Sequence, residues 1–403
     1  MALPPTVRRL GLVSLLTDAS SEMIYPLLPS FLTGVLRAGP AFVGLVEGLA
    51  ESVASLLKVA SGWLSDRVRR RKPLVVAGYT LSSIARPLVA LATAPWHVLA
   101  VRLTDRVGKG VRNAPRDALL AQVAPPRELG RAFGFQRAMD HAGAVIGPLL
   151  ASAVLLVRDD VRLVFALAAL PGAAAVLVLA FGVAEAPPEA PPAEGAPAWP
   201  SGPGPDPAAD PASTPGLRRF LAVVGLFTLG NSSDAFLLLR AQAAGVPLAL
   251  IPLLWTAHHV VKAAASTAGG ALSDRAGRRA TIAAGWVVYA IVYAGLAVAS
   301  RPWQAWLLFA VYGLFHALTE GPERALVTEL AASDARGRAF GSFHALTGIL
   351  LLPASLLTGA LWQAFSPAVA LFTGAGIALA ATAALLALVR VPDRAGLRSV
   401  EGG

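Results

Sequence analysis

The 403-residue chain contains no cysteine and only three methionines. Without thiols, neither a disulfide framework nor a thiolate metal site can form. The spacing of its histidines and glutamates fits no recognised metal site, so we expect no bound metal. The sequence also lacks a Gly-x-x-x-x-Gly-Lys-[Ser/Thr] segment and any spacing typical of a catalytic serine with histidine and aspartate. These absences argue against a nucleotide-driven pump, an enzyme and a resident cofactor.

Charged residues are scarce as well. They make up 14% of the chain, whereas hydrophobic residues make up 55% and the mean hydropathy is +0.62. A soluble domain carries about a quarter charged residues, so most of this surface must face lipid. The net charge of +10 would also suit a nucleic-acid partner. However, the basic residues concentrate in loops on one side of the apolar segments, so we expect a lipid bilayer and no nucleic acid as partner.

Twelve apolar segments are long enough to cross a bilayer, which takes about 20 helical residues. Proline and glycine mark the short gaps between them. The first six segments are 8–36, 42–65, 73–93, 95–122, 131–157 and 161–183. The second six are 217–243, 246–273, 280–300, 302–330, 337–364 and 366–390.

Basic residues divide unevenly between the two sides of these segments. The poor side holds only Arg37, Arg158, Arg162, Arg240 and Arg301. The rich side is cytoplasmic by the positive-inside rule, which places both termini in the cytoplasm. A composition rich in arginine and alanine but poor in lysine is typical of a GC-rich bacterial genome. We therefore expect a multi-pass protein of a bacterial inner membrane, and expect it to be a monomer.

Residues 185–216 interrupt the pattern. They are rich in proline, alanine and glycine, with five acidic residues and no basic one. Such a segment cannot bury a core and is expected to be an extended linker. The predicted organisation is therefore a bundle of six helices over 1–184, a cytoplasmic linker over 185–216, a second bundle over 217–390 and a tail over 391–403.

An internal repeat relates the two halves. Gly62-Trp63-Leu64-Ser65-Asp66-Arg67 returns 208 residues downstream as Gly270-Ala271-Leu272-Ser273-Asp274-Arg275. Gly130-Arg131-Ala132-Phe133-Gly134 returns as Gly337-Arg338-Ala339-Phe340-Gly341. Repeats in membrane proteins are typical of transporters in which two bundles rock about a central site.

The chain has twelve segments in two groups of six, and each group contains one copy of the first repeated loop. This pattern resembles the major facilitator superfamily of secondary transporters. The family pattern is Gly-x-Leu-[Ala/Ser]-Asp-Arg-x-Gly-[Arg/Lys]-[Arg/Lys]. The second copy fits throughout, through Gly277, Arg278 and Arg279, whereas the first has Arg69 in place of glycine. The resemblance implies an all-α integral membrane fold with twelve transmembrane helices in two pseudo-symmetric six-helix bundles.

The same resemblance implies that the two loops act as a conformational latch on the cytoplasmic side. Asp66 would engage the start of the eleventh span, and Arg70 would pair with Asp117. Asp274 and Arg278 would do the same around the fifth span, with Glu329 as a candidate partner. The predicted latch residues are Gly62, Asp66, Arg67, Arg70, Arg71, Asp117, Gly270, Asp274, Arg275 and Arg278.

In the fifth span, Gly143-x-x-x-Gly147-Pro148 resembles a motif of proton-coupled exporters. Its tail, Ala151-Ser152, departs from the Gly-Gly of that motif. Small residues at this spacing let two helices approach closely. The sequence leaves open whether the motif indicates export or ordinary helix packing.

Ionisable residues inside a membrane are costly, and each is a candidate functional group. Asp18 and Glu22 lie four residues apart and so share one helix face. Two close carboxylates in a low dielectric raise each other's affinity for protons, as proton coupling requires. A static pair neutralised by neighbouring arginines is the alternative. Glu51 in the second span and Asp140 in the fifth complete the predicted proton-coupling set.

The fourth span is the most charged, and most of its charges follow a spacing of three to four residues. A helix facing lipid would not carry this stripe, which must line a cavity or a buried network. Arginine suits bidentate contact with a carboxylate or phosphate, so an anionic group is one interpretation and a structural salt-bridge network the other. Candidate substrate-binding residues in the first half are Arg86, Arg102, Asp105, Arg106, Lys109, Arg137 and His141.

The second half is sparser in charge. His259, Lys262, His316 and Glu320 are its candidate substrate-binding residues. Histidine titrates near neutral pH, so His259 or His316 could carry a proton, although a buried histidine can equally be a hydrogen-bonded structural group. Trp255 and Tyr312 are further candidates to line the site of an organic substrate.

These features predict a secondary active transporter that works by alternating access between its two halves. Proton-driven export of drugs or metabolites is the first interpretation. Proton-coupled uptake of a polar or anionic solute is the second, because the predicted cavity is highly charged. A membrane sensor with a transporter fold is a third, and no large soluble signalling domain supports it.

Overall fold

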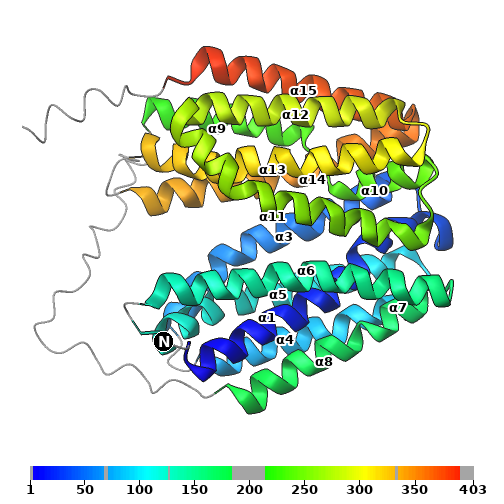
Figure 1. Ribbon diagram of the computed structural model, residues 1–403, viewed down its shortest axis with the longest axis vertical. Coiled ribbons are helices and arrows are strands. Elements are labelled where there is room, and N and C mark those ends of the chain that lie inside the picture. Colours follow the sequence, from blue (N-terminus) through cyan, green and yellow to red (C-terminus); the bar gives the residue numbers. More distant parts are fainter. Residues whose placement is uncertain (1–2, 68–70, 126–127, 184–213, 332–334, 391–403) are drawn as a thin grey trace, which may run out of the picture.

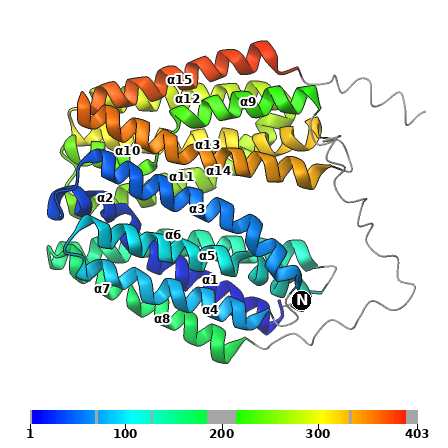
Figure 2. The same ribbon diagram turned by 180° about the vertical axis from the view of Figure 1, so that it is seen from behind.

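The computed structural model describes residues 3–67, 71–125, 128–183, 214–331 and 335–390, without the side chains of residues 58–67. Within these ranges the chain is helical and forms no strand. The helices lie side by side in two bundles, one from each half of the sequence (Figure 1). Helix α1 begins and helix α15 ends at the same end of the molecule, here called the terminal side (Figure 2). The opposite end is called the far side.

The first bundle contains long helices that alternate in direction, several of them interrupted by short 3-10 or π segments. They are α1 (Pro5–Ile24), η1 (Tyr25–Leu27), α2 (Leu28–Ser30), η2 (Phe31–Val35), α3 (Pro40–Arg67), α4 (Lys72–Ala85), η3 (Arg86–Leu91), α5 (Pro95–Val123), α6 (Leu129–Val157), α7 (Val161–Leu167), α8 (Ala169–Leu177) and η5 (Val178–Gly182).

The second bundle repeats this arrangement. Its helices are α9 (Pro215–Gly230), α10 (Asp234–Ala243), η6 (Leu248–Leu250), α11 (Ile251–Ala276), α12 (Arg278–Val298), α13 (Pro302–Leu330), α14 (Arg336–Ala364) and α15 (Pro367–Leu388). Helices α5 and α13 each contain one internal proline at equivalent places, Pro115 and Pro322.

Nine of the described helical segments are long and apolar enough to cross a membrane by composition. Three further crossings complete the expected twelve: the α1–η2 segment, α5 and α13. Composition misses these three because they carry ionisable side chains, such as Glu22 on α1, Lys109 on α5 and Glu320 on α13. These side chains face the interior of the molecule, where they line cavities.

One predicted crossing is not a continuous helix. The sequence predicts a single segment over 217–243, but α9 ends at Gly230 and α10 starts at Asp234. The intervening Asn231, Ser232 and Ser233 favour local side-chain hydrogen bonds over helix. Ser233 accepts a hydrogen bond from the backbone N–H of Ala235 and so caps α10.

The linker ends earlier in the sequence than predicted. Helix α9 begins at Pro215, two residues before the predicted start of the second bundle, because Thr214 caps it and proline suits the first helical turn. The rest of the linker and the tail over 391–403 lie outside the described residues, so the expectation of an extended tether stays a prediction.

The cores of the two bundles differ in chemistry. The second bundle has a core of large aromatic side chains, in which Phe227 stacks on Trp286 with ring centroids 4.5 Å apart. The interior of the first bundle includes buried charged residues, among them Arg102, Asp105 and Arg112. The fold therefore places most intramembrane charge in the first bundle.

The two bundles pack tightly on the far side. A Cβ atom added to Gly44 of α3 would lie 2.3 Å from the backbone oxygen of Ser355 on α14. Further along the same pair of helices, the Ser52 hydroxyl donates a 2.7 Å hydrogen bond to the carbonyl oxygen of Gly348. The Ser30 hydroxyl likewise bonds the Gln242 side chain across the two halves at 2.7 Å.

The terminal side is different. The repeated motifs that begin α6 and α14 carry glycines, and Cβ atoms added to them would meet no other atom within 4 Å: Gly130, Gly134, Gly337 and Gly341. The glycine-bearing faces at the terminal ends of these two helices are therefore not covered by other described residues. The interior is closed on the far side and open towards the terminal side.

Candidate functional site

A cavity of about 500 Å³ lies between the two bundles. It adjoins a second cavity of about 800 Å³, which reaches Asp117, Arg137, Arg324 and His344 near the terminal ends of their helices. Six residues line both cavities: Asp18, Glu22, Lys109, Arg112, His259 and Lys262. The two hollows are thus the inner and outer parts of one polar cavity, called here the central cavity.

Three ion pairs tie α5 to its neighbours on one wall of the central cavity. Arg86 Nε lies 2.8 Å from Asp105 Oδ1. Arg102 Nη2 donates to both carboxylate oxygens of Glu47, at 3.0 and 2.9 Å. Arg106 Nη2 lies 2.7 Å from Glu51 Oε1.

These ion pairs neutralise charges that would otherwise be costly to bury. Removing one member of a buried pair commonly costs about 3–5 kcal/mol, because the other charge is left uncompensated. The arginines at positions 86, 102 and 106 are therefore already held by acids of the same bundle. The sequence left a bound anion and a salt-bridge network as alternatives for them, and this geometry favours the network.

Two cations further along α5 have no such partner. Arg112 is only 3% exposed, and its Nε and Nη1 atoms have no hydrogen-bond partner. Its guanidinium carbon lies 4.3 Å from the ring centroid of Tyr79, a cation–π contact that orients it. Lys109, one turn away, forms no ion pair with any described residue.

The close packing of α5 against α4 holds these cations in place. A Cβ atom added to Gly108 would lie 2.7 Å from the carbonyl oxygen of Gly78. A glycine at this position lets the backbone of α4 approach α5 this closely. Arg112 follows Gly108 by one turn and so lies against the same helix, beside Tyr79.

Acidic residues face these cations from α1. Asp18 and Glu22 both line the central cavity, as their four-residue spacing predicts. Glu22 Oε2 accepts a 2.9 Å hydrogen bond from Trp255 Nε1 of the opposite bundle. Neither carboxylate forms an ion pair with a described residue. The Glu22–Trp255 bond thus joins an ionisable group directly to the interface between the halves.

The second bundle contributes a mixed polar and aromatic wall. Asp234, the first residue of α10, accepts a 2.6 Å hydrogen bond from the Tyr312 hydroxyl. Lys262 Nζ lies 2.6 Å from Glu320, and His316 Nδ1 lies 3.3 Å from the same carboxylate. The candidates of this half therefore form one cluster on α11 and α13.

The structure brings most predicted site residues to the central cavity. Asp18, Glu22, Glu51, Arg86, Arg102, Asp105, Arg106, Lys109, His259, Lys262 and His316 line its inner part. Arg137, Asp140 and His141 line only the outer part, where Arg137 has a side chain 73% exposed and lies 3.9 Å from Asp140. Glu320 lies beside the cavity through its contact with Lys262. The roles of all these residues stay predictions.

Three charged residues that line the inner part of the cavity were absent from the candidate set: Glu47, Arg112 and Asp234. The signal for Asp234 was the Asn231-Ser232-Ser233 run just before it, which breaks the helix and exposes the site. Broken helices at the midplane are a mark of transporter binding sites.

The predicted latch is only partly described. The side chains of Gly62, Asp66 and Arg67 and the whole of Arg70 lie outside the described residues. Among the others, Asp117 lies 2.9 Å from its neighbour Arg116. Its expected pairing with Arg70 stays a prediction.

The second copy of the loop is better defined. Arg278 Nη1 lies 2.5 Å from Glu329 and also donates to the Ala325 carbonyl at 3.0 Å. Arg278 therefore contacts its candidate partner Glu329, and the latch role of the two residues stays a prediction. The contact ties the start of α12 to the end of α13 on the terminal side. Gly270, Asp274 and Arg275 lie in the last turns of α11, and Arg71 directly precedes α4.

The Gly143-x-x-x-Gly147-Pro148 motif lies where α6 crosses α1. Cβ atoms added to Gly143 and Gly147 would lie 2.4 Å from the carbonyl oxygens of Leu15 and Ala19. Pro148 is buried inside α6. Small side chains at these positions let α6 approach the helix that carries Asp18, as expected for helix packing.

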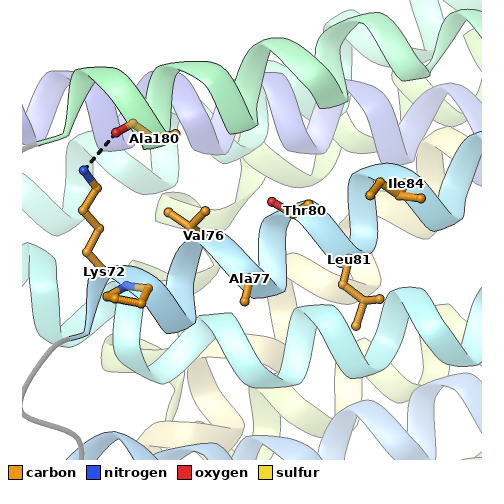
Figure 3. Close-up of a pocket in the computed structure, with 8 residues that line it drawn as sticks. Lys72, Val76, Ala77, Thr80, Leu81, Ile84 and Ala180 are labelled. Atoms are coloured by element: carbon orange, nitrogen blue, oxygen red, sulfur yellow. Dashed lines mark hydrogen bonds between the residues drawn. The ribbon is translucent and has the colours of Figure 1, made fainter.

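A separate groove lies on the outside of the first bundle, between α4 and η5 (Figure 3). Its lining is apolar apart from Thr80 and Lys72, whose Nζ donates a 2.9 Å hydrogen bond to the Ala180 carbonyl. The exposed Leu81 and Ile84 side chains line it. This lining suits a lipid chain and lacks the convergent polar groups of the central cavity.

Comparison with known proteins agrees with this architecture. The family profile of the Major Facilitator Superfamily matches residues 10–242 and again 220–402. An uncharacterized MFS-type transporter of Methanocaldococcus jannaschii is 36% identical over 404 residues, covering 94% of this chain and 93% of that protein. The multidrug resistance protein MdtH of Photorhabdus laumondii is 32% identical over 160 residues, covering 38% of this chain and 40% of that protein.

A solved structure supports the same fold. The nucleoside transporter NupG matches with a TM-score of 0.79 and 14% sequence identity. The match covers 96% of this chain and 100% of that chain. An identity this low shows the fold alone. The profile match over both halves and the relative that is 36% identical show the family, and the two bundles and the repeated loop agree with it. This chain therefore belongs to the major facilitator superfamily of multi-pass membrane transporters.

Proposed function

We propose that this protein is a proton-coupled secondary active transporter of a polar solute that carries a negative charge. The observation that carries the proposal is the pair Lys109 and Arg112 in the central cavity, which have no acidic partner among the described residues. A buried, unpartnered cation costs several kcal/mol, and a bound anion would offset that cost. Guanidinium suits bidentate contact with carboxylate or phosphate.

Proton coupling is assigned to Asp18 and Glu22. Both face the central cavity without an ion-pair partner among the described residues, so their charge depends on protons and on the solute. Glu22 also contacts Trp255 across the two halves. A change in the charge of Glu22 therefore acts on the interface that must open and close during transport.

Alternating access follows from the packing of the halves. The terminal side is cytoplasmic if the excess of basic residues there obeys the positive-inside rule. The far side is then closed by α3 and α14, and the central cavity opens to the cytoplasm. In the opposite state, the unpacked glycines at the starts of α6 and α14 and the loop latches would close the cytoplasmic side.

Replacing Gly44 by valine should open the far side. The new side chain cannot fit against the Ser355 carbonyl. Overpacking costs about 1–3 kcal/mol, enough to change the ratio of the two states about tenfold. Because the chain has no cysteine, a Ser233→Cys probe in the cavity can be labelled cleanly by an impermeant thiol reagent.

The probe should react at least about five times faster from the far side in Gly44→Val than in the parent. Gly376→Val is the matched control, because a Cβ atom at Gly376 meets no atom within 4 Å. Equal labelling rates in the parent and Gly44→Val would show that this contact does not hold the far side closed.

Export of drugs is a second candidate function. One observation favours it: the partial similarity to the multidrug resistance protein MdtH. The charged lining of the central cavity favours a polar solute over the apolar molecules that such exporters commonly carry. A panel of solutes should therefore include cationic drugs as well as anionic and dipolar metabolites.

Transport in proteoliposomes tests the proposal. The full chain, reconstituted with an imposed pH gradient, should move at least one anionic or dipolar solute in a direction that reverses when the gradient is reversed. Liposomes without protein are the control. Movement of cationic drugs alone would favour the second candidate, and no protein-dependent movement of any solute would remove both.

A further inference from the structure

The central cavity has two oppositely charged walls. On the wall formed by α5, Lys109 and Arg112 present positive charge with no acidic partner among the described residues. The neighbouring arginines are already neutralised, because Arg86, Arg102 and Arg106 each form an ion pair with an acidic side chain. The α5 wall therefore offers one open anion subsite, formed by Lys109 and Arg112 beside Tyr79.

The facing wall is acidic and aromatic. Asp234 accepts a hydrogen bond from Tyr312 but forms no ion pair with a described residue. It lies in the first turn of α10, where the positive end of the helix dipole attracts a negative charge. The rings of Tyr25 and Trp255, 5.3 Å apart, line the same cavity. A carboxylate in a cavity lined by aromatic rings is the chemistry that binds an organic ammonium group.

The charges that line the inner part of the central cavity point to the net charge of the ligand. Once the ion-paired groups are set aside, two cations on α5 remain opposite Asp18, Glu22 and Asp234. One proton on the Asp18–Glu22 pair makes these remaining charges equal in number. With these charges balanced, a simple anion would add an unmatched negative charge to the cavity, and a simple cation would add an unmatched positive charge.

We infer that the transported solute is a zwitterion, with its carboxylate or phosphate at Lys109 and Arg112 and its ammonium group at Asp234. This inference rests on the proposed function and names its substrate class. A neutral dipolar solute satisfies both walls at once. It also leaves Asp18 and Glu22 free to exchange protons, since neither is needed to hold the ammonium group.

Binding of matched ligands to the purified full-length chain in lipid nanodiscs tests this inference. The probes are ω-amino carboxylates from three to six carbons, the n-alkyl carboxylates of the same lengths and the corresponding n-alkylamines. Isothermal titration at constant ionic strength measures each affinity. At least one amino carboxylate should bind at least ten times tighter than both of its single-charge analogues. The second charge–charge contact should contribute more than the ~1.4 kcal/mol that corresponds to a tenfold change in affinity.

Two variants separate the subsites. Asp234→Asn should reduce amino carboxylate affinity at least tenfold and leave alkyl carboxylate affinity unchanged. Arg112→Gln should weaken amino carboxylates and alkyl carboxylates alike, with alkylamines unaffected. The matched controls are Asp159→Asn and Arg158→Gln, which remove the same groups from the exposed turn before α7. Unfolding temperatures of all four variants identify any loss of folding.

Alkyl carboxylates that bind as tightly as amino carboxylates would overturn the zwitterion inference and leave the proposed transport of an anion intact. Absence of binding by every amino carboxylate would also overturn it. An equal response of amino carboxylates to Asp234→Asn and Asp159→Asn would overturn the ammonium subsite. The proposed function fails separately, in the proteoliposome experiment, if no solute moves with the pH gradient.

Discussion

Replacing Asp105 by asparagine is expected to destabilise the first bundle by about 3–5 kcal/mol, the usual cost of leaving one buried charge without its partner. Asp105 is 3% exposed and Arg86 is 5% exposed. Their contact of 2.8 Å is the one that neutralises Arg86. Asparagine keeps the size of the side chain but removes the charge, so the loss is electrostatic rather than steric.

The effect should extend beyond Arg86. Arg102 and Arg106 lie on the same stretch of α5 and add positive charge around Asp105. Without the carboxylate, this part of α5 carries an excess of cations inside the bundle. We therefore expect Asp105→Asn to lose transport as well as stability.

Reversible unfolding in mixed micelles, followed by tryptophan fluorescence, measures the change. The double variant Arg86→Gln/Asp105→Asn should recover part of the stability, because it removes both charges together. Asp159→Asn should change the free energy of unfolding by no more than about 0.5 kcal/mol, as exposed substitutions usually do. If Asp105→Asn resembles this control, the ion pair does not hold α5 against η3.

Replacing Glu22 by glutamine is expected to abolish proton-driven accumulation while leaving solute exchange intact. With one proton moved per solute, a gradient of one pH unit supports about tenfold accumulation, since ~1.4 kcal/mol corresponds to a factor of ten. Glutamine cannot take up or release that proton, so the accumulation ratio should fall to about one. The amide oxygen still accepts a hydrogen bond from Trp255, which preserves the contact between the halves.

Proteoliposomes distinguish coupling from folding. Accumulation driven by a pH gradient and counterflow without one are measured on the same preparation. Counterflow should persist in Glu22→Gln, because it needs the conformational cycle but no net proton movement. Glu128→Gln, at the terminal end of α6, removes a carboxylate outside the cavity and serves as the control. Normal proton-driven accumulation in Glu22→Gln would remove Glu22 as the proton carrier.

Much of the fold could be predicted because membrane insertion imposes strong local rules. Apolar length predicts most crossings, and the repeated loop predicts two related halves. The four-residue spacing of Asp18 and Glu22 correctly places both on one helix face towards the interior. Such predictions succeed because helix periodicity and the cost of exposing charge to lipid act on short stretches of chain.

The pairings within the central cavity could not be predicted in the same way. Arg102 and Glu47 are 55 residues apart in the sequence, and they form an ion pair only because α3 and α5 pack against each other. The break before Asp234 depends on a three-residue run whose helix preference is weak, and tertiary contacts decide whether such a run stays helical. The Glu22–Trp255 contact joins residues 233 positions apart.

The amino-acid sequence alone predicts a membrane protein of two related helical bundles with charge concentrated in the first. Hydropathy, loop charge and repetition suffice for this, because each is a property of a segment and its solvent. Only the tertiary structure decided which charges are already neutralised. Coulomb attraction between buried groups depends on their separation and their partners. The cations of α5 therefore divide into ion-paired arginines and the unpaired Lys109 and Arg112 only after the helices are packed.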